Sequence, residues 1–163
     1  MSSSSPEATL GNLKRSALGW LGRREFSRHG MQQRIYRRFP DADAADVEEV
    51  LQWLEAQNYL NDARFGAMLI RYRVGRGQGP LRVRQALQAE KITSELMDNL
   101  LAEADIDWFA QAVDTHQRRF ENRPAEDQRE KARQLRFLQY RGFTAEQCYA
   151  ALEEHKRRMQ NDE

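Results

Sequence analysis

Apolar side chains return every three or four residues along almost the whole chain, and this spacing is what most limits the fold. Phe65, Met68, Leu69 and Tyr72 follow the i, i+3, i+4, i+7 pattern of an amphipathic helix. No segment alternates with period two, and valine and isoleucine, which favour strands, total only nine. The sequence therefore predicts an all-α fold.

An internal repeat organises the predicted helices. The segment Val83–Ala104 aligns with Gln134–His155 at an offset of 51 residues without a gap, which places Thr93 on Thr144. The segment Arg34–Ala56 fits the same plan with a longer loop. Tandem units of this kind bury apolar surface mainly against their neighbours. We therefore predict three tandem three-helix repeats that form an elongated, curved array.

The breaks between helices predict where each repeat begins and ends. N-caps are expected at Asp62, at Thr93 or Ser94, at Asp107 and at Thr144, and Gly142 suits the position that follows a helix. The predicted segments are a disordered leader at 1–10, repeat 1 at 11–61, repeat 2 at 62–104, repeat 3 at 105–158 and a tail at 159–163.

Charge is arranged in blocks that follow the repeats, although the net charge is only +1. Residues 40–62 hold seven acids and no base, residues 63–89 hold six arginines and no acid, and residues 90–114 hold seven acids and one lysine. Solvated helix faces would explain any single block. Blocks in register with the repeats favour a basic stripe for a polynucleotide or filament partner. Of the 26 basic residues 22 are arginine, which suits phosphate contacts but also fits a GC-rich genome.

The longest acid-free basic block, residues 63–89, contains the stretch RYRVGRGQGPLRVRQAL, residues 71–87. The glycines of this stretch form G-x-G-x-G, which matches neither nucleotide-binding glycine motif, and they follow a predicted helix where those motifs need a strand. We therefore expect a reversal between two helices, which would gather the arginines on its two sides into one patch. The candidate binding residues here are Arg71, Arg73, Arg76, Arg82 and Arg84.

No catalytic or metal-binding constellation is evident in the sequence. His29, His116 and His155 lie far apart without ligand spacing, and Cys148 belongs to an apolar helix face. We therefore predict no enzymatic activity and no catalytic, cofactor-binding or metal-binding residues.

Three tyrosines, Tyr36, Tyr72 and Tyr140, adjoin arginines. Exposed tyrosines beside arginines would stack on nucleic-acid bases. Aromatic residues at helical spacing also fit a core, and we favour burial.

Three features bear on the cellular setting. No run of about eighteen apolar residues is present to cross a membrane, and MSSSSPEAT, residues 1–9, lacks the apolar stretch of a signal peptide. A single cysteine cannot form an intramolecular disulfide, which indicates a reducing compartment. We also expect a monomer, because no exposed apolar heptad is evident.

Four segments together closely resemble RecX, the bacterial regulator of the RecA recombinase, and the resemblance covers roughly residues 13–155. The segments are ALGWLGRREFSRHGMQQRI (Ala17–Ile35), YLNDARF (Tyr59–Phe65), GQGPLRVRQALQAEKI (Gly77–Ile92) and RFLQYRGF (Arg136–Phe143). The chain departs from the family in having Lys91 where glycine is frequent, Asn61 where Asp is frequent, and Ala86 where Glu is usual.

The resemblance implies an all-α, non-catalytic, cytoplasmic regulator that acts in DNA repair, homologous recombination and the SOS response. Family members bind RecA and the groove of its filament on single-stranded DNA, and they inhibit ATP hydrolysis, strand exchange and coprotease activity. Some members also bind DNA directly. Two alternatives remain: a general DNA- or RNA-binding helical protein without a RecA role, and a helical-repeat scaffold for another protein.

The resemblance extends the set of candidate residues. Further candidate contacts to RecA or DNA are Arg24, Arg28, Arg136 and Arg141. Motif residues expected to have structural roles are Tyr59, Leu60, Asp62, Phe65, Gly77, Gly79, Leu87 and Gly142.

Overall fold

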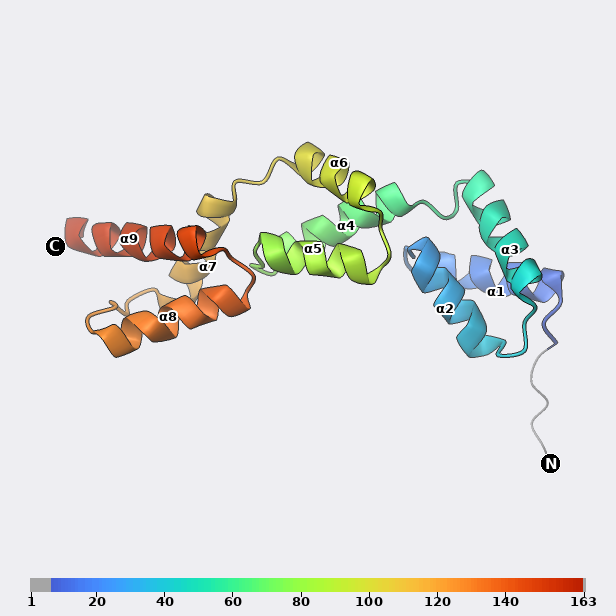
Figure 1. Ribbon diagram of the computed structural model, residues 1–163, viewed down its shortest axis with the longest axis horizontal. Coiled ribbons are helices and arrows are strands. Elements are labelled where there is room, and N and C mark those ends of the chain that lie inside the picture. The colour runs from blue at the N-terminus through green and yellow to red at the C-terminus, as the bar shows by residue number, and fades with distance from the viewer. Residues whose placement is uncertain (1–6, 163) are drawn as a thin grey trace, which may run out of the picture. The chain divides into compact units, whose positions relative to one another are not determined.

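The computed structural model describes residues 7–162, which form nine α-helices and no strand (Figure 1). The all-α prediction is confirmed. The helices are α1 (Leu10–Leu21), α2 (Arg28–Arg38), α3 (Ala44–Ala56), α4 (Asp62–Gly75), α5 (Pro80–Ala89), α6 (Ser94–Ala104), α7 (Trp108–Phe120), α8 (Gln128–Tyr140) and α9 (Ala145–Asn161).

Both ends of the chain differ in detail from the predicted segments. The first six residues of the predicted leader lie outside the described residues, and α1 already begins at Leu10. Helix α9 continues to Asn161, into the segment predicted as a tail.

The described residues divide into two compact units. The first contains the residues up to Gly66 together with Glu90–Ile92, and the second contains Ala67–Ala89 and the residues from Thr93 onward. This division does not follow the three predicted repeats, so their boundaries at 11–61, 62–104 and 105–158 stay a proposal.

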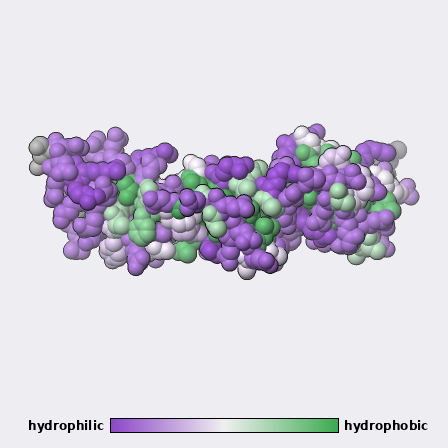
Figure 2. Space-filling view, turned by 90° about the horizontal axis from the view of Figure 1, so that it is seen from above, coloured by the Kyte–Doolittle hydropathy of each residue, from purple (hydrophilic) through white to green (hydrophobic). Residues whose placement is uncertain are grey.

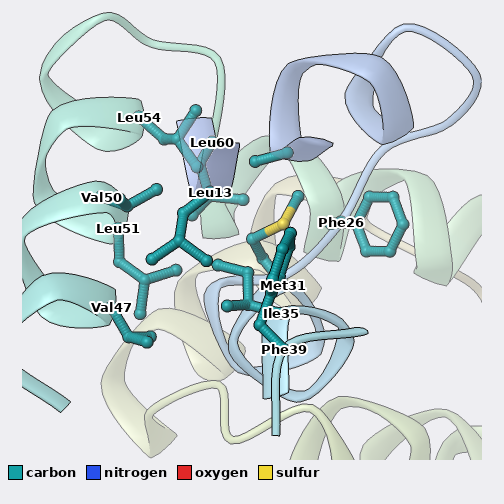
Figure 3. Close-up of a cluster of buried hydrophobic side chains, with 11 residues drawn as sticks. Leu13, Phe26, Met31, Ile35, Phe39, Val47, Val50, Leu51, Leu54 and Leu60 are labelled. Atoms are coloured by element: carbon teal, nitrogen blue, oxygen red, sulfur yellow. The ribbon is translucent and has the colours of Figure 1, made fainter. Parts of the chain in front are cut away.

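The first unit has a core in which α1, α2 and α3 pack together. Leu13, Met31, Ile35, Leu51 and Leu54 are completely buried, and Figure 3 shows their side chains pointing toward one another. They sit three or four residues apart within each helix, so the helical spacing of the sequence places them on the inward faces.

The start of α4 corrects one prediction about the YLND motif. The side chain of Asn61 accepts a hydrogen bond from the backbone N–H of Arg64 at 2.9 Å, so Asn61 is the cap of α4. The carboxylate of Asp62 instead accepts from the backbone N–H of Arg28 at 2.7 Å, at the first residue of α2. The prediction that Asp62 caps α4 is therefore wrong, because its side chain satisfies a free N–H of another helix.

In the second unit, α9 packs against α7 and α8. Ala112, Leu138, Phe143 and Ala151 are almost completely buried between these helices, and Cys148 lies among them as predicted. The predicted caps are confirmed at Thr93, Asp107 and Thr144, and Thr144 forms a full capping box with Gln147.

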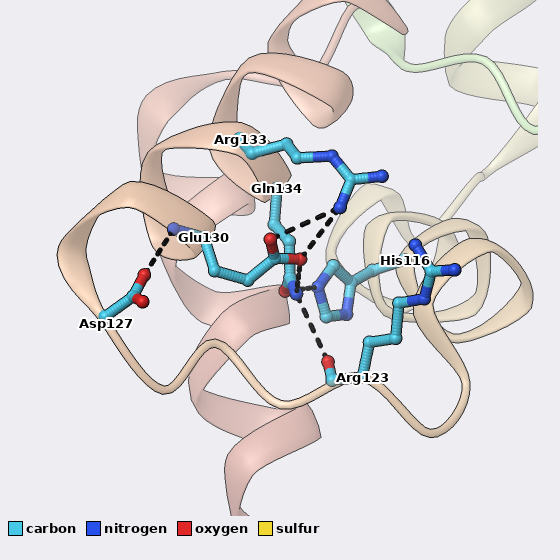
Figure 4. Close-up of polar contacts among 6 residues, drawn as sticks. All are labelled: His116, Arg123, Asp127, Glu130, Arg133 and Gln134. Atoms are coloured by element: carbon cyan, nitrogen blue, oxygen red, sulfur yellow. Dashed lines mark hydrogen bonds and ion pairs between the residues drawn. The ribbon is translucent and has the colours of Figure 1, made fainter.

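A buried polar network joins α7 to α8 in the second unit (Figure 4). The imidazole Nε2 of His116 donates to Oε1 of Gln134 at 2.7 Å, and the Gln134 amide donates to the backbone oxygen of Arg123 and to Glu130, both at 3.2 Å. The other ring nitrogen of His116 is buried without a hydrogen-bond partner. Burial, reinforced by the charge of His155, lowers the pKa of His116, although its hydrogen bond to Gln134 acts in the opposite direction.

Two turns of the second unit meet backbone to backbone at Gly79 and Gly142. The N–H of Gly79 donates to the oxygen of Arg141 at 2.8 Å, and the N–H of Leu81 donates to the oxygen of Gly142 at 2.9 Å. A Cβ atom on Gly79 would lie 2.5 Å from the backbone of Gly142, and one on Gly142 would lie 2.4 Å from the side chain of Arg82. Only glycine fits at either position, and the contact fixes the start of α5 on the turn between α8 and α9.

The internal repeat is visible in the backbone of two equivalent turns. Gly142, predicted to follow α8, has φ of +99°, and its repeat partner Lys91 has φ of +58°. A lysine in this left-handed region is strained by its Cβ atom. A glycine at this position would not be strained.

The surface is strongly polar. Hydrophilic residues cover most of the face seen in Figure 2, with apolar residues in scattered areas between them, as expected for a chain with 31% charged residues. Within residues 7–162, no helix is long and apolar enough to span a membrane.

The stability of the protein is expected to fall as pH drops below about 6.5, the ordinary pKa of histidine. The fold lowers the pKa of His116, so His116 takes up a proton in the unfolded chain at a higher pH than in the folded protein. Between these two pKa values the free energy of unfolding falls by no more than about 1.4 kcal/mol per pH unit. Urea unfolding across this range measures the effect. His116→Gln keeps a donor for Gln134 but does not titrate, so it should reduce the dependence of the free energy of unfolding on pH. An unchanged dependence would contradict the assignment of this effect to His116.

Gly79→Ala is expected to destabilise the protein by about 2 kcal/mol or more, because the new methyl group collides with the backbone of Gly142. Gly75→Ala, at the end of α4 beside this turn, is the matched control. No atom lies within 4 Å of a Cβ at Gly75, so this change should be neutral or slightly stabilising. Thermal unfolding of the two variants makes the comparison, and equal melting temperatures would rule out the proposed collision.

Lys91→Gly is expected to stabilise the protein by about 0.5 kcal/mol. Glycine removes the strain of the left-handed backbone at Lys91. Part of this gain is offset because glycine loses more conformational entropy on folding than lysine does. Lys91→Ala, which removes the same charge but keeps a Cβ atom, is the control and should give no such gain. Denaturant midpoints of the two variants distinguish strain relief from an effect of charge.

Candidate partner-binding surface around the glycine turn

The glycine turn between α4 and α5 is a helix-to-helix reversal, as predicted. Gly77 has φ of +78°, and its N–H donates to the oxygen of Val74 at 2.9 Å. The other N–H groups of the turn also donate to backbone carbonyl oxygens; they belong to Arg76, Gln78, Gly79 and Leu81. Pro80 has no N–H group. No backbone donor of the turn is left to cradle a phosphate, so the phosphate-loop interpretation is excluded.

The carbonyl groups of this turn are satisfied by side chains of α7. Gln111 donates to the oxygen of Val74 at 2.7 Å, and Thr115 donates to the oxygen of Gly77 at 3.1 Å. These bonds hold the turn against α7 and so determine which arginines surround it.

Two predicted binding residues, Arg82 and Arg141, are used to hold the two turns together. Nε of Arg82 donates to the oxygen of Tyr140 at 2.8 Å, and its guanidinium lies 4.6 Å from the centre of the Tyr140 ring. Nη1 of Arg141 donates to the oxygen of Arg76 at 2.9 Å, while its guanidinium lies over the ring of Phe137. Each still has donors that can meet a partner, because an arginine has five N–H groups.

The remaining arginines of the stretch lie in separate surroundings. Arg84 pairs with Asp98 of α6 at 3.3 Å, and Arg73 contacts the Gln78 side chain. Arg71 is exposed beside a pocket of about 370 Å³ between α4 and α6. Since Arg82 faces the 140–142 turn and Arg84 faces α6, the arginines on the two sides of the turn do not form the single patch that we expected.

Two candidates lie in the first unit. Arg28 is held between Glu48 at 2.5 Å and Glu55 at 2.7 Å, so carboxylates of the same unit already neutralise it. Arg24 is exposed and lies over the ring of Phe26 at 4.1 Å. The last candidate, Arg136, is exposed on α8 of the second unit.

The motif residues of the first unit have mainly structural surroundings. Leu60 and Phe65 are buried, while Tyr59 is about half exposed and packs against Trp53. In the second unit, Leu87 is completely buried.

The tyrosines correct a second prediction. Tyr36 packs partly buried against the core of the first unit, as expected. Tyr72 and Tyr140, however, are 56% and 71% exposed, so the prediction of burial is wrong for both. Each carries a guanidinium near its ring, from Arg76 at 5.7 Å and Arg82 at 4.6 Å.

The structure also brings together arginines that the sequence did not single out. Beside the glycine turn is a pocket of about 260 Å³ to which α4, α7 and the end of α8 contribute. We call it the four-arginine pocket, after Arg76, Arg118, Arg119 and Arg141. Arg118 and Arg119 follow Thr115 on α7, and the bonds that Gln111 and Thr115 donate to the glycine turn place them beside it.

The chain matches the family models of two RecX domains, the second three-helix domain over residues 61–101 and the third three-helix domain over residues 105–152. It is 41% identical to the regulatory protein RecX of Halorhodospira halophila over 136 residues, 83% of each chain. It is 43% identical to that of Acidithiobacillus ferrooxidans over 130 residues, 80% of this chain and 81% of the relative.

Among solved structures, RecX from Lactobacillus salivarius has a similar fold, with a TM-score of 0.76 at 16% identity over 90% of this chain and 96% of that one. The two domain models and the identity to curated relatives over most of their length lead to one conclusion. The chain belongs to the RecX family of regulatory proteins.

Proposed function

We propose that this protein is a non-catalytic negative regulator of RecA that binds RecA and the groove of its filament on single-stranded DNA. The observation that carries the proposal is the identity of 41 to 43% to RecX regulatory proteins over most of the chain. The acid-free basic block at residues 63–89, with Arg71, Arg76 and Arg84 exposed, supports it by offering positive charge to a negatively charged filament.

The proposed mechanism is non-covalent. A ligand shifts an equilibrium only if it binds one state better than the other. The protein would therefore favour a filament state that hydrolyses ATP slowly and does not support strand exchange or coprotease activity. The three proposed repeats would each contribute surface to this contact, with the protein acting as a monomer in the cytoplasm.

The predicted contact residues differ in how available they are. Arg71, Arg84, Arg24 and Arg136 are exposed, and none of them holds the glycine turn in place. Arg82 and Arg141 already hold the turn, and Arg28 is paired with two carboxylates. We therefore assign the main contact in the second unit to Arg71 and Arg84, and to Arg73 and Arg76 a contribution beside the turn.

The wild-type protein is expected to slow ATP hydrolysis by RecA on single-stranded DNA. The double charge reversal Arg71→Glu, Arg84→Glu should require about tenfold more protein for the same inhibition, because like charges across an interface cost about 1.4 kcal/mol or more. Steady-state hydrolysis measured against protein concentration gives the comparison.

The control is Arg157→Glu, Arg158→Glu, which reverses two exposed arginines near the end of α9. It should retain inhibition, and circular dichroism should show unchanged helicity in both variants. The proposal of RecA regulation would be contradicted if saturating wild-type protein left ATP hydrolysis by RecA unchanged and did not bind to filaments. Binding to DNA that is equal with and without RecA, and falls steeply with salt, would instead favour the general nucleic-acid-binding alternative.

A further inference from the structure

A partly apolar groove, which we call the α7–α9 groove, lies between these two helices of the second unit. Residues of both helices line it, and its volume is about 660 Å³. The apolar part of the lining consists of Phe109, Ala110 and Val113 from α7 and Ala150 from α9. Phe109 is 47% exposed, so a large aromatic ring is open to solvent beside this unfilled volume. An exposed aromatic side chain next to a groove is typical of a surface that binds another protein.

The rest of the lining is mainly acidic. Four carboxylates line the groove together with only two cations, Arg157 and Arg158, and both arginines pair with the same carboxylate, that of Glu154. The other three carboxylates belong to Asp107, Asp114 and Glu153. Asp114 pairs with Arg118 at 3.2 Å, but these side chains are 55% and 73% exposed, so the pair contributes little energy. The groove therefore attracts a cationic ligand and repels an anionic one.

The apolar residues of the groove lie on a different side of α7 from the glycine turn. Gln111 and Thr115 face the turn, to which they donate hydrogen bonds. Phe109 and Val113 each stand two residues before one of them, and residues two apart are about 200° apart around the axis of an α-helix. A partner that contacts the arginines around the turn therefore does not cover Phe109 and Val113, and the two surfaces can bind different partners.

The chemistry of the groove favours a protein segment over other ligands. Nucleic acid is disfavoured because the carboxylates repel its phosphates. A metal ion is not indicated, since no group of three metal-binding side chains occurs in the part of the chain that the structure describes. A groove between two helices, with an apolar surface and charged residues beside it, suits the apolar face of an amphipathic helix. Lysines or arginines that flank this face would meet the carboxylates of the groove.

We propose that the α7–α9 groove docks a basic amphipathic helix of a protein other than RecA. An apolar side chain of this helix packs against Phe109 and Val113, and its lysines or arginines face the acidic residues of the groove. The site goes beyond the proposed regulation of RecA, because Arg71 and Arg84, to which the main RecA contact is assigned, do not line the groove. The chain could thus hold a second protein while its arginines contact the filament.

The test measures binding of a fluorescein-labelled peptide to the full chain by anisotropy, without RecA or nucleic acid. The peptide has about fifteen residues, with leucine at every third or fourth position and lysine elsewhere. Phe109→Ala should weaken binding about tenfold or more, because aromatic side chains carry much of the energy of protein interfaces. Tyr149→Ala is the matched control. Tyr149 is 53% exposed on α9 but does not line the groove, so this change should alter affinity less than about twofold.

A second pair of variants tests the acidic part of the groove. Asp107→Asn, Glu153→Gln removes two carboxylates of the lining, and asparagine can still cap α7. Peptide binding should weaken about fivefold at low salt and become less dependent on salt, because fewer charge pairs cross the interface. Glu121→Gln, Glu146→Gln removes two exposed carboxylates of the same unit outside the groove and should change affinity less than about twofold. Circular dichroism and the melting temperature control for folding in all variants.

Several results would overturn the proposal. Absence of peptide binding by the wild-type protein, or equal loss of affinity in Phe109→Ala and Tyr149→Ala, would show that the groove is not the binding site. Equal affinity for a peptide with glutamate in place of lysine would mean that charge plays no part. Equal affinity for a peptide with serine in place of leucine would mean that only charge matters.

Two further measurements separate other occupants of the groove. Sedimentation of the wild-type protein should show no self-association that Phe109→Ala abolishes, since such a loss would assign the groove to a second copy of this chain. Phe109→Ala should also inhibit ATP hydrolysis by RecA as the wild-type protein does. Loss of this inhibition together with peptide binding would make the groove part of the RecA contact.

Discussion

The backbone contact between Gly79 and Gly142 is the constraint on which the second unit depends. Two hydrogen bonds, at 2.8 and 2.9 Å, join the turn before α5 to the turn after α8, and neither position has room for a Cβ atom. With the turns in register, Arg82 reaches the oxygen of Tyr140 and Arg141 reaches that of Arg76. The contact between these two glycines, which are far apart in the sequence, thus fixes the positions of the arginines around them.

The same frame divides arginines that look equivalent in the sequence. Because backbone carbonyls and α7 side chains satisfy the polar groups of the turn, its glycines bind no ligand themselves. Some arginines complete the structure by reaching carbonyl oxygens, while others extend over aromatic rings toward solvent. Long apolar stems with a planar charged end allow arginine to serve both purposes. A stretch that resembles a phosphate loop in composition therefore borders a basic pocket made by side chains.

Features that depend on local sequence were predictable here, and features that depend on contacts between distant segments were not. Thr93 and Thr144 cap their helices as expected, because capping needs only the residues that follow. Asn61 and Asp62 are both good caps, and only the distant N–H of Arg28 decides between them. Tyr36 and Tyr72 have the same local pattern, yet only the first meets a core. The sequence did not indicate that Arg118 and Arg119 lie beside the glycine turn. The contact that brings α7 to this turn joins Thr115 to Gly77, which are 38 residues apart in the chain.

The block arrangement of charge bears on how one chain could meet both a protein and a nucleic acid. A net charge of +1 gives little long-range attraction to bare nucleic acid. At physiological salt, charges act over about 8 Å, so each basic or acidic block acts locally. Acidic segments such as residues 90–114 would be repelled by a bare polynucleotide but can face a protein surface. The proposed filament presents protein and nucleic acid side by side. The basic blocks could contact its nucleic acid while the acidic blocks contact its protein surface. On this argument, specificity for a nucleoprotein comes as much from the acidic helices as from the arginines.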